Sequence, residues 1–240
     1  MTITAGNRHF RDLNAAIQAT PEAEVTIENC CGQRYIAAGL SGKQLTIHGV
    51  PGNALGAYMD GGSIVTDGNV QDAVGDTMND GVIVVHGHCG DSAGYAMRGG
   101  QIYIQGNVGY RAGIHMKAYK EKLPVLVVGG CTGSFLGEYQ AGGLIIVLGL
   151  HRGDTPLTGY FCGTGMHGGR MFLRCEEPPA NLPAQITVQE ATDAELAEIA
   201  PYIDAFCGYF GEDREQLLHS RFFVLTPNSK NPYKQLYTYN

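Results

Sequence analysis

Residues 83–101 read IVVHGHCGDSAGYAMRGGQ, and this stretch is one copy of a 19-residue repeat. Its glycines Gly87, Gly90 and Gly94 are spaced G-x-x-G-x-x-x-G. The same spacing, or a weaker copy of it, recurs at Gly49, Gly52 and Gly56, at Gly68 and Gly75, at Gly106, Gly109 and Gly113, and at Gly130, Gly133 and Gly137. The first glycines fall at positions 49, 68, 87, 106, 130 and 149, so the steps are 19, 19, 19, 24 and 19. Such a period predicts stacked units, none of which buries a core alone.

Each unit of the repeat predicts one short strand. Apolar residues stand four and two positions before each first glycine, as Ile83 and Val85 do before Gly87. Alternating β-branched residues favour a strand. The unit is too short to contain a crossover helix, so the pattern favours a parallel β-solenoid with strands about 4.8 Å apart. Glycine would be needed where the chain turns a corner or approaches the next unit closely.

One position of the repeat contains five of the seven methionines of the chain. Three residues after the third glycine stand Met59, Met78, Met97, Met116 and, after an insertion, Met166. We expect these side chains to point inward and to stack, because methionine fills irregular core space well. The column contains neither Cys nor His, so it does not indicate a metal site.

The chain divides into three predicted segments. Residues 1–40 form an N-terminal helix, indicated by Phe10, Leu13 and Ile17 at helical spacing, and a lead-in segment. Residues 41–175 form the repeat, an all-β parallel β-helix of about six to seven coils. Residues 176–240 form an α/β cap, whose helix starts at a capping box of Thr192 and Glu195. We expect this cap to cover the open end of the solenoid.

Composition excludes several classes of protein. The net charge is −7 and no basic run occurs, which argues against a nucleic-acid partner. Seven cysteines without a C-x-x-C motif indicate reduced thiols. No apolar run reaches the roughly 18 residues of a membrane span, and no targeting segment opens the chain. We therefore expect a cytoplasmic protein that contacts no membrane.

Two motifs of enzymes overlap the repeat. Residues 90–94 match G-x-S-x-G around Ser92, the pattern of a serine-hydrolase nucleophile. Both glycines are repeat positions, however, and no strand–turn–helix context follows. Residues 163–168 match G-x-G-x-x-G, but a strand is expected after them, where a dinucleotide site needs a helix. The repeat explains both motifs, and an autonomous hydrolase remains the lesser alternative.

Histidines near the turns are the only metal-ligand candidates. His86 and His88 alternate near one strand end, whereas His151, Cys162 and His167 flank the last insertion. Neither group has the fixed spacing of a zinc site. We therefore expect no metal site, no bound cofactor and no catalytic residue in this chain.

Two sets of residues are candidate partner contacts. Arg98 and Lys117 occupy the same position in successive units. Like charges this close repel each other unless an anion or a partner lies on them. The alternative is that both side chains lie on a solvated edge. Val84 and Tyr103 belong to an apolar column that should point away from the interior. Either the terminal helices, near residues 10–17 and 196–206, or another protein should cover that column.

The motifs together resemble the C-terminal domain of the glutamate synthase large subunit and, less closely, a subunit of formylmethanofuran dehydrogenase. The resemblance covers roughly residues 28–175. It is carried by Gly39-Leu40-Ser41-Gly42, the Gly49, Gly52, Gly56 series, Gly68-Asn69, Val74-Gly75-Asp76, Gly94-Tyr95-Ala96-Met97-Arg98-Gly99-Gly100, Gly142-Gly143-Leu144-Ile145-Ile146-Val147-Leu148-Gly149, and the run 163–169.

The resemblance implies a right-handed parallel β-helix that braces amidotransferase and flavin-binding synthase subunits. Two features of that family are absent: the chain begins Met1-Thr2 where an amidotransferase has cysteine, and it lacks the cysteine cluster that ligates iron and sulfur. The implied function is therefore that of a non-catalytic structural subunit in glutamate biosynthesis. Its partners would hold FMN and iron–sulfur clusters and would transfer the amino group of glutamine to 2-oxoglutarate. The alternative function is that of a subunit of a formylmethanofuran-dehydrogenase-type oxidoreductase. The alternative partner for the binding surface is a second copy of the chain.

Overall fold

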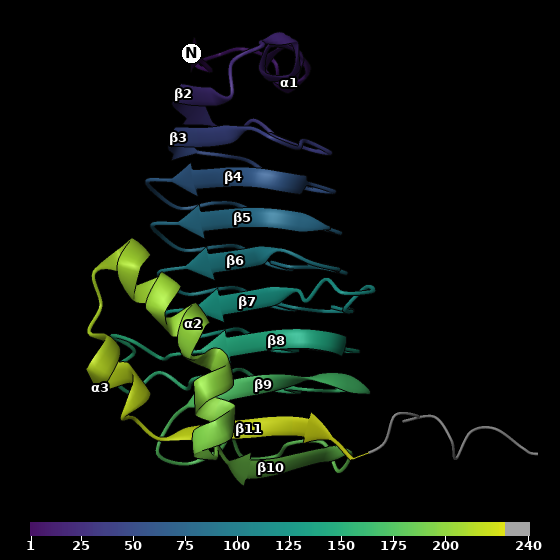
Figure 1. The fold of residues 1–240 in the computed structure, drawn as a ribbon, viewed down its shortest axis with the longest axis vertical. Helices are drawn as coiled ribbons and strands as arrows, with labels where there is room; N and C mark the ends of the chain where they lie inside the picture. The colour runs from purple at the N-terminus through teal and green to yellow at the C-terminus, as the bar shows by residue number, and fades with distance from the viewer. Residues whose placement is uncertain (229–240) are drawn as a thin grey trace, which may run out of the picture.

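The computed structural model of the chain describes residues 1–228. Their strands form one 11-stranded sheet in the order β1-β2-β3-β4-β5-β6-β7-β8-β9-β11-β10, accompanied by three helices (Figure 1). The elements are β1 (Thr2–Thr4), α1 (Phe10–Ala19), β2 (Glu24–Cys31), β3 (Gln44–Val50), β4 (Asp60–Thr66), β5 (Asp80–Val85), β6 (Gln101–Ile104), β7 (Val125–Val128), β8 (Ala141–Val147), β9 (Gly168–Arg174), β10 (Ile186–Glu190), α2 (Asp193–Phe210), α3 (Arg214–Leu218) and β11 (Phe222–Pro227).

The predicted fold class, an all-β right-handed parallel β-helix of six to seven coils, is wrong. The strands form a single open and mixed sheet: neighbours from β1 to β9 are parallel, and the pairs β9–β11 and β11–β10 are antiparallel. A closed solenoid needs further strands in each unit. Here the glycine-rich part of each unit forms turns. Successive turns are linked by backbone hydrogen bonds such as Gly94 N–H to the Val74 carbonyl, and by isolated bridges such as Val70 with Cys89, but these turns form no further strands among residues 1–228. The sheet therefore does not close.

The register of the sheet follows the repeat. Ile83 of β5 pairs with Ile102 of β6, and Ile102 pairs with Leu126 of β7. Equivalent positions of successive units thus lie opposite one another, even across the unit that is 24 residues long. The extra residues lie between β6 and β7, outside the sheet, so the insertion does not shift the pairing.

Side-chain acceptors tie each turn to the next one. The Asn69 Oδ1 accepts a hydrogen bond from the backbone N–H of His88 at 2.8 Å, and the His88 Nδ1 accepts that of Asn107 at 2.9 Å. The Asn107 Oδ1 in turn accepts the N–H of Cys131 at 2.8 Å. These side chains provide acceptors for backbone N–H groups that lie beyond the ends of the strands.

A second ladder runs through the same turns. The Asp72 Oδ1 accepts the N–H of Asp91 at 2.9 Å, and the Asp91 Oδ1 accepts the N–H of Tyr110 at 2.8 Å. Further along, the Ser134 Oγ accepts the N–H of Tyr160 at 3.0 Å. The sheet thus joins the units on one side, and side-chain ladders join them on the other.

The ladders explain why the repeat needs glycine. A Cβ at Gly130 would lie 2.1 Å from the Asn107 Oδ1, and a Cβ at Gly109 would lie 2.1 Å from the Asp91 Oδ1. The third glycine has another reason: Gly113 has a φ of +66°, and a Cβ there would lie 2.5 Å from the Ile145 Cδ1. Each glycine column is therefore required by a different steric contact.

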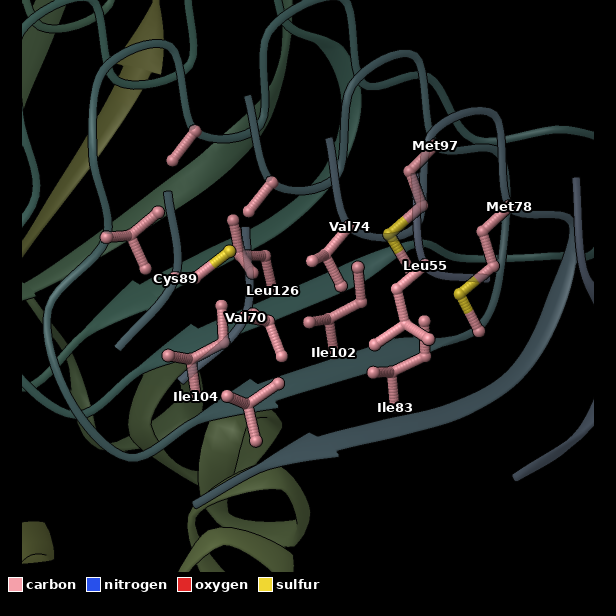
Figure 2. Close-up of a cluster of buried hydrophobic side chains, with 14 of the residues drawn as sticks. Leu55, Val70, Val74, Met78, Ile83, Cys89, Met97, Ile102, Ile104 and Leu126 are labelled. Atoms are coloured by element: carbon pink, nitrogen blue, oxygen red, sulfur yellow. The ribbon is translucent and has the colours of Figure 1, made fainter. Parts of the chain in front are cut away.

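The inner core lies between one face of the sheet and the turns. The methionine column is buried in it, with Met59 1% exposed and Met78, Met97, Met116 and Met166 0% exposed. Figure 2 shows Met78 and Met97 in the same cluster as Leu55, Val74 and Ile102. The unit that has glutamine at this position also buries it: Gln140 donates from Nε2 to the carbonyls of Gly142 and Gly143 at 3.2 Å.

The outer face of the sheet has a second core beneath α2. Val84 and Tyr103 are 1% and 0% exposed, in a cluster with Ile199, Ile203 and Phe206 of the helix. Figure 1 shows α2 running along one side of the sheet from the level of β10 to that of β6. The C-terminal helix therefore covers the outward column over the later units.

The N-terminal helix lies elsewhere. Leu13 and Ile17 of α1 belong to the inner core, at the end of the sheet formed by β1 and β2 (Figure 1). The cover of the outward column ends towards the first units. Val65 of β4 is partly buried and packs at the edge of the second core, and Thr46 of β3 is exposed. No helix among residues 1–228 is long and apolar enough to cross a membrane.

Candidate functional site

The structure places the predicted partner contacts in two different environments. Arg98 and Lys117 are exposed at the turns, and the Arg98 guanidinium lies 5.9 Å from the centroid of the Tyr119 ring. Val84 and Tyr103 lie beneath α2. The Tyr103 hydroxyl donates a hydrogen bond to the Gln101 Oε1 at 2.5 Å, and burial raises its pKa. The protein's own helix thus occupies the surface that Val84 and Tyr103 form.

The insertion at residues 117–124 folds back onto the sheet. The Lys122 Nζ lies 2.8 Å from the Asp60 Oδ1 and 3.2 Å from the Asp80 Oδ2. Hydrogen bonds to these two carboxylates raise the pKa of Lys122. These ion pairs join the insertion to the first residues of β4 and β5, but all three side chains are exposed, so the pairs contribute little to stability.

The residues of the hydrolase and zinc motifs take part in packing. Ser92 has a φ of +60°, and its backbone N–H donates to the Tyr110 carbonyl at 2.7 Å. The His86 ring packs edge-on against Phe210 at 5.0 Å, and the His88 Nδ1 is part of a turn ladder. Among residues 1–228, no group of three or more His, Cys, Asp or Glu is arranged to hold a metal ion.

Burial favours the neutral thiol at three cysteines. Burial raises the pKa of Cys30 to about 11 and that of Cys162 to about 12. Burial also raises the pKa of Cys89. Since the thiolate is the reactive form, these side chains act as small apolar core residues.

Aromatic side chains, exposed or partly exposed, form two columns on the turns of the later units. We call the following residues the aromatic ridge: Tyr95, Tyr110, Arg111, His115, Phe135, Tyr139, Tyr160 and Phe161. In one column the Arg111 guanidinium lies 4.9 Å from the Phe135 ring, which stacks on Phe161 at 5.0 Å. In the other, His115 stacks on Tyr139 at 5.2 Å and meets Tyr95 at 6.0 Å. The repeat places these rings one above another.

The aromatic ridge is exposed and conformationally costly. Tyr160, Phe161 and Tyr110 are 77%, 57% and 54% exposed. Arg111 and Phe161 have φ values of 58° and 62°, in the left-handed region, where a residue with a Cβ costs about 1–2 kcal/mol. The earlier units fill the same turn position with Ala54, Ala73 and Ser92. Ala54, Ala73 and Ser92 have the same left-handed φ, so the strain is common to these units. What distinguishes the later units is that large side chains stand at this costly position and gain little burial, which points to a role outside folding.

A signal for the aromatic ridge was present in the sequence. The turn position of Ser92 becomes Arg111 and then Phe135 in later units. This change of residue type argues against a hydrolase motif and also creates the ridge. Its exposure could not be read from the sequence, because an apolar residue in a repeat is more often a core residue.

The fold and this surface define a repeat protein that builds a rigid stack and displays aromatic side chains along its turns. The chain belongs to the GXGXG motif family, whose sequence model matches residues 11–228. This match confirms the family resemblance that the glycine motifs carry. The chain is 45% identical over 251 residues to the uncharacterized protein MJ1350 of Methanocaldococcus jannaschii, an alignment that covers 99% of this chain and 96% of that relative.

A solved structure is similar in fold. It is a chain of the X-ray crystal structure of the formyltransferase/hydrolase complex FhcABCD from Methylorubrum extorquens in complex with methylofuran. The TM-score is 0.65 and the identity 18%, and the match covers 87% of this chain and 79% of that chain. At this identity the likeness shows the fold, and the chain that shares it is a subunit of a multi-subunit complex.

Proposed function

We propose that this protein is a non-catalytic structural subunit of a multi-subunit enzyme complex and that the aromatic ridge binds a partner subunit. One observation carries the proposal: large, exposed side chains occupy left-handed turn positions, as Phe161 does at a φ of 62°. Aromatic residues and arginine are enriched where protein interfaces have their strongest contacts. A partner that buries these rings would offset their strain.

Two complexes are candidates. The fold of a chain in the formyltransferase/hydrolase complex supports a subunit of a formylmethanofuran-dehydrogenase-type enzyme. The glycine motifs support a glutamate-synthase-like complex, in which amidotransferase and flavin-binding subunits would hold FMN and iron–sulfur clusters and this chain would hold none. The structural match, which covers 79% of the solved chain, favours the first candidate over the second. In both, the chemistry belongs to the partners.

The test is co-purification with the products of neighbouring genes, followed by size-exclusion chromatography. Tyr110→Ser and Phe161→Gly should weaken assembly. The Phe161→Gly chain should keep its stability within about 1 kcal/mol, because relief of left-handed strain offsets the lost stacking on Phe135. Ala73→Gly is the matched control, since Ala73 has a φ of 59° at the same turn position without an aromatic ring. A complex that assembles equally well with all three variants would refute the role of the ridge.

A further inference from the structure

Two adjoining cavities lie where the last insertion meets the linker after β9. One has a volume of about 540 Å³ and the other of about 460 Å³. Arg152 and Cys175 line both of them. The first lies between the loop at residues 152–161 and the linker at 177–181, and the second reaches Arg174, at the end of β9, and Arg221, before β11.

The second cavity gathers positive charge in an acidic protein. Arg152, Arg174 and Arg221 line it, whereas the chain as a whole has a net charge of −7. Arg221 is neutralised by Glu190, whose Oε2 lies 2.8 Å from its Nη2. Glu176 lines the cavity as well, and it is exposed. The positive charge is therefore only partly compensated by the protein's own carboxylates.

Arg152 and Arg174 bind backbone rather than carboxylate. Arg152 donates from Nη1 to the Thr155 carbonyl at 2.8 Å, and Arg174 donates from Nη1 to the Leu148 carbonyl at 2.9 Å. Within residues 1–228 neither forms an ion pair, and the buried Arg174 Nε has no hydrogen-bond partner. Burial lowers the pKa of Arg174, Glu176 opposes this effect, and Arg152 adds to it. An anion beside these two guanidinium groups would relieve their mutual repulsion.

The first cavity is mainly apolar. Leu157, Tyr160 and Phe161 contribute side chains to its wall, and Glu177 lies on it too. The Thr132 side chain is 5% exposed, and its hydroxyl, on the same wall, has no hydrogen-bond partner among the described residues. A ring or short chain could pack here, with the hydroxyl available to one polar atom of that group.

We propose that the two cavities together bind a small organic anion. Its carboxylate or phosphate head lies between Arg152 and Arg174, and its apolar or aromatic body packs on Leu157, Tyr160 and Phe161. Guanidinium groups match both kinds of head in geometry and charge. The volumes are those of a small-molecule pocket rather than of a protein groove. Tyr160 and Phe161 also belong to the aromatic ridge, so a partner on the ridge would compete for the apolar half of the site. The site needs no residue from a partner, so titration of the isolated chain tests it separately from assembly.

The test uses the full chain, isothermal titration calorimetry and four probes: phenyl phosphate, benzoate, inorganic phosphate and benzyl alcohol. We expect phenyl phosphate or benzoate to bind saturably, inorganic phosphate to bind more weakly and benzyl alcohol not to bind. Added salt should weaken binding, because it screens the charges. The tighter of the two aromatic anions identifies the head group. Equal binding of benzyl alcohol, or no binding of either aromatic anion, would overturn the proposal.

Variants separate the two halves of the site. Arg152→Gln should weaken the binding of phenyl phosphate at least about tenfold, since a charged hydrogen bond is lost. Tyr160→Ala should weaken the binding of phenyl phosphate but leave the binding of inorganic phosphate unchanged. Arg11→Gln, on α1 at the other end of the sheet, is the control and should change neither. Circular dichroism verifies that each variant is folded. An Arg152→Gln chain that is folded and binds as tightly as the parent would exclude the site.

Discussion

Gly129 lies directly beneath the ring of Phe206. A Cβ at Gly129, the residue after β7, would be 2.7 Å from the Phe206 Cζ and 2.1 Å from the Gln105 carbonyl oxygen. Phe206 itself is 0% exposed. The helix α2 can therefore approach the sheet closely because this position has no side chain.

Gly129→Ala should lower the free energy of unfolding by about 1–3 kcal/mol, because a methyl group would overfill the contact between α2 and the sheet. The measurement is urea denaturation followed by circular dichroism. Gly208→Ala within α2 is the control, since a Cβ there meets nothing within 4 Å. The control should be neutral or stabilising by up to about 1 kcal/mol, as alanine favours helix over glycine. A fully stable Gly129→Ala chain would contradict both close contacts, the one with Phe206 and the one with the Gln105 carbonyl.

Tyr103→Ser should destabilise the chain by about 3–5 kcal/mol, because Tyr103 is 0% exposed beneath α2. Val84→Ser should act in the same direction. Thr46→Ser, at the exposed equivalent position of β3, should have little effect. Denaturation gives the stabilities, and size-exclusion chromatography with partners gives assembly. Loss of assembly at unchanged stability would show that a partner, and not α2, covers these residues.

Met97→Asp should unfold the chain. Met97 is 0% exposed in the inner core, and a carboxylate there would lose its hydration without a partner. Met97→Leu nearly conserves the volume and should cost less than about 1.5 kcal/mol. Thermal melting of both variants is the measurement. A Met97→Asp chain with nearly unchanged melting would contradict the inward methionine column.

Asn107→Ala should cost about 1–3 kcal/mol, because it leaves the backbone N–H of Cys131 without its acceptor. Asn107→Asp keeps an oxygen at the same place and should cost less. Amide hydrogen exchange gives a local measurement, in which the Cys131 amide should exchange faster in the alanine variant only. Unchanged exchange at Cys131 would show that the ladder bond contributes nothing.

His48 should titrate above its ordinary pKa of 6.5, because the Asp67 Oδ2 lies 2.7 Å from its Nδ1. The hydrogen bond to His48 lowers the pKa of Asp67 below its ordinary 3.8. The contribution of His48 to stability is full below pH 6.5 and is lost as the pH rises through its folded pKa. The contribution of Asp67 is full above pH 3.8 and is lost as the pH falls through its folded pKa. NMR titration of the His48 ring should show a lower pKa in Asp67→Asn; an identical pKa would rule out the pair.

The sequence by itself determined the units, their register and the inward column. A regular step places Ile83 opposite Ile102 and Met78 beside Met97, so local spacing alone predicts these neighbours, and the same spacing identifies the family. The three glycine columns were visible as a pattern. Their causes, such as the contact of Gly130 with the Asn107 side chain, became clear only from the geometry of the stacked turns.

Only the tertiary structure decided the rest. Whether the turns would add strands and close a solenoid depended on hydrogen bonds between units, and the structure shows an open sheet with antiparallel strands at one end. The contact of Tyr103 with Tyr209 of α2 and the cavity shared by Arg152 and Arg221 join residues far apart in the chain. The repeat predicts contacts between residues one period apart, and these contacts are not of that kind. They arise from how α2 and the linker after β9 fold back onto the stack.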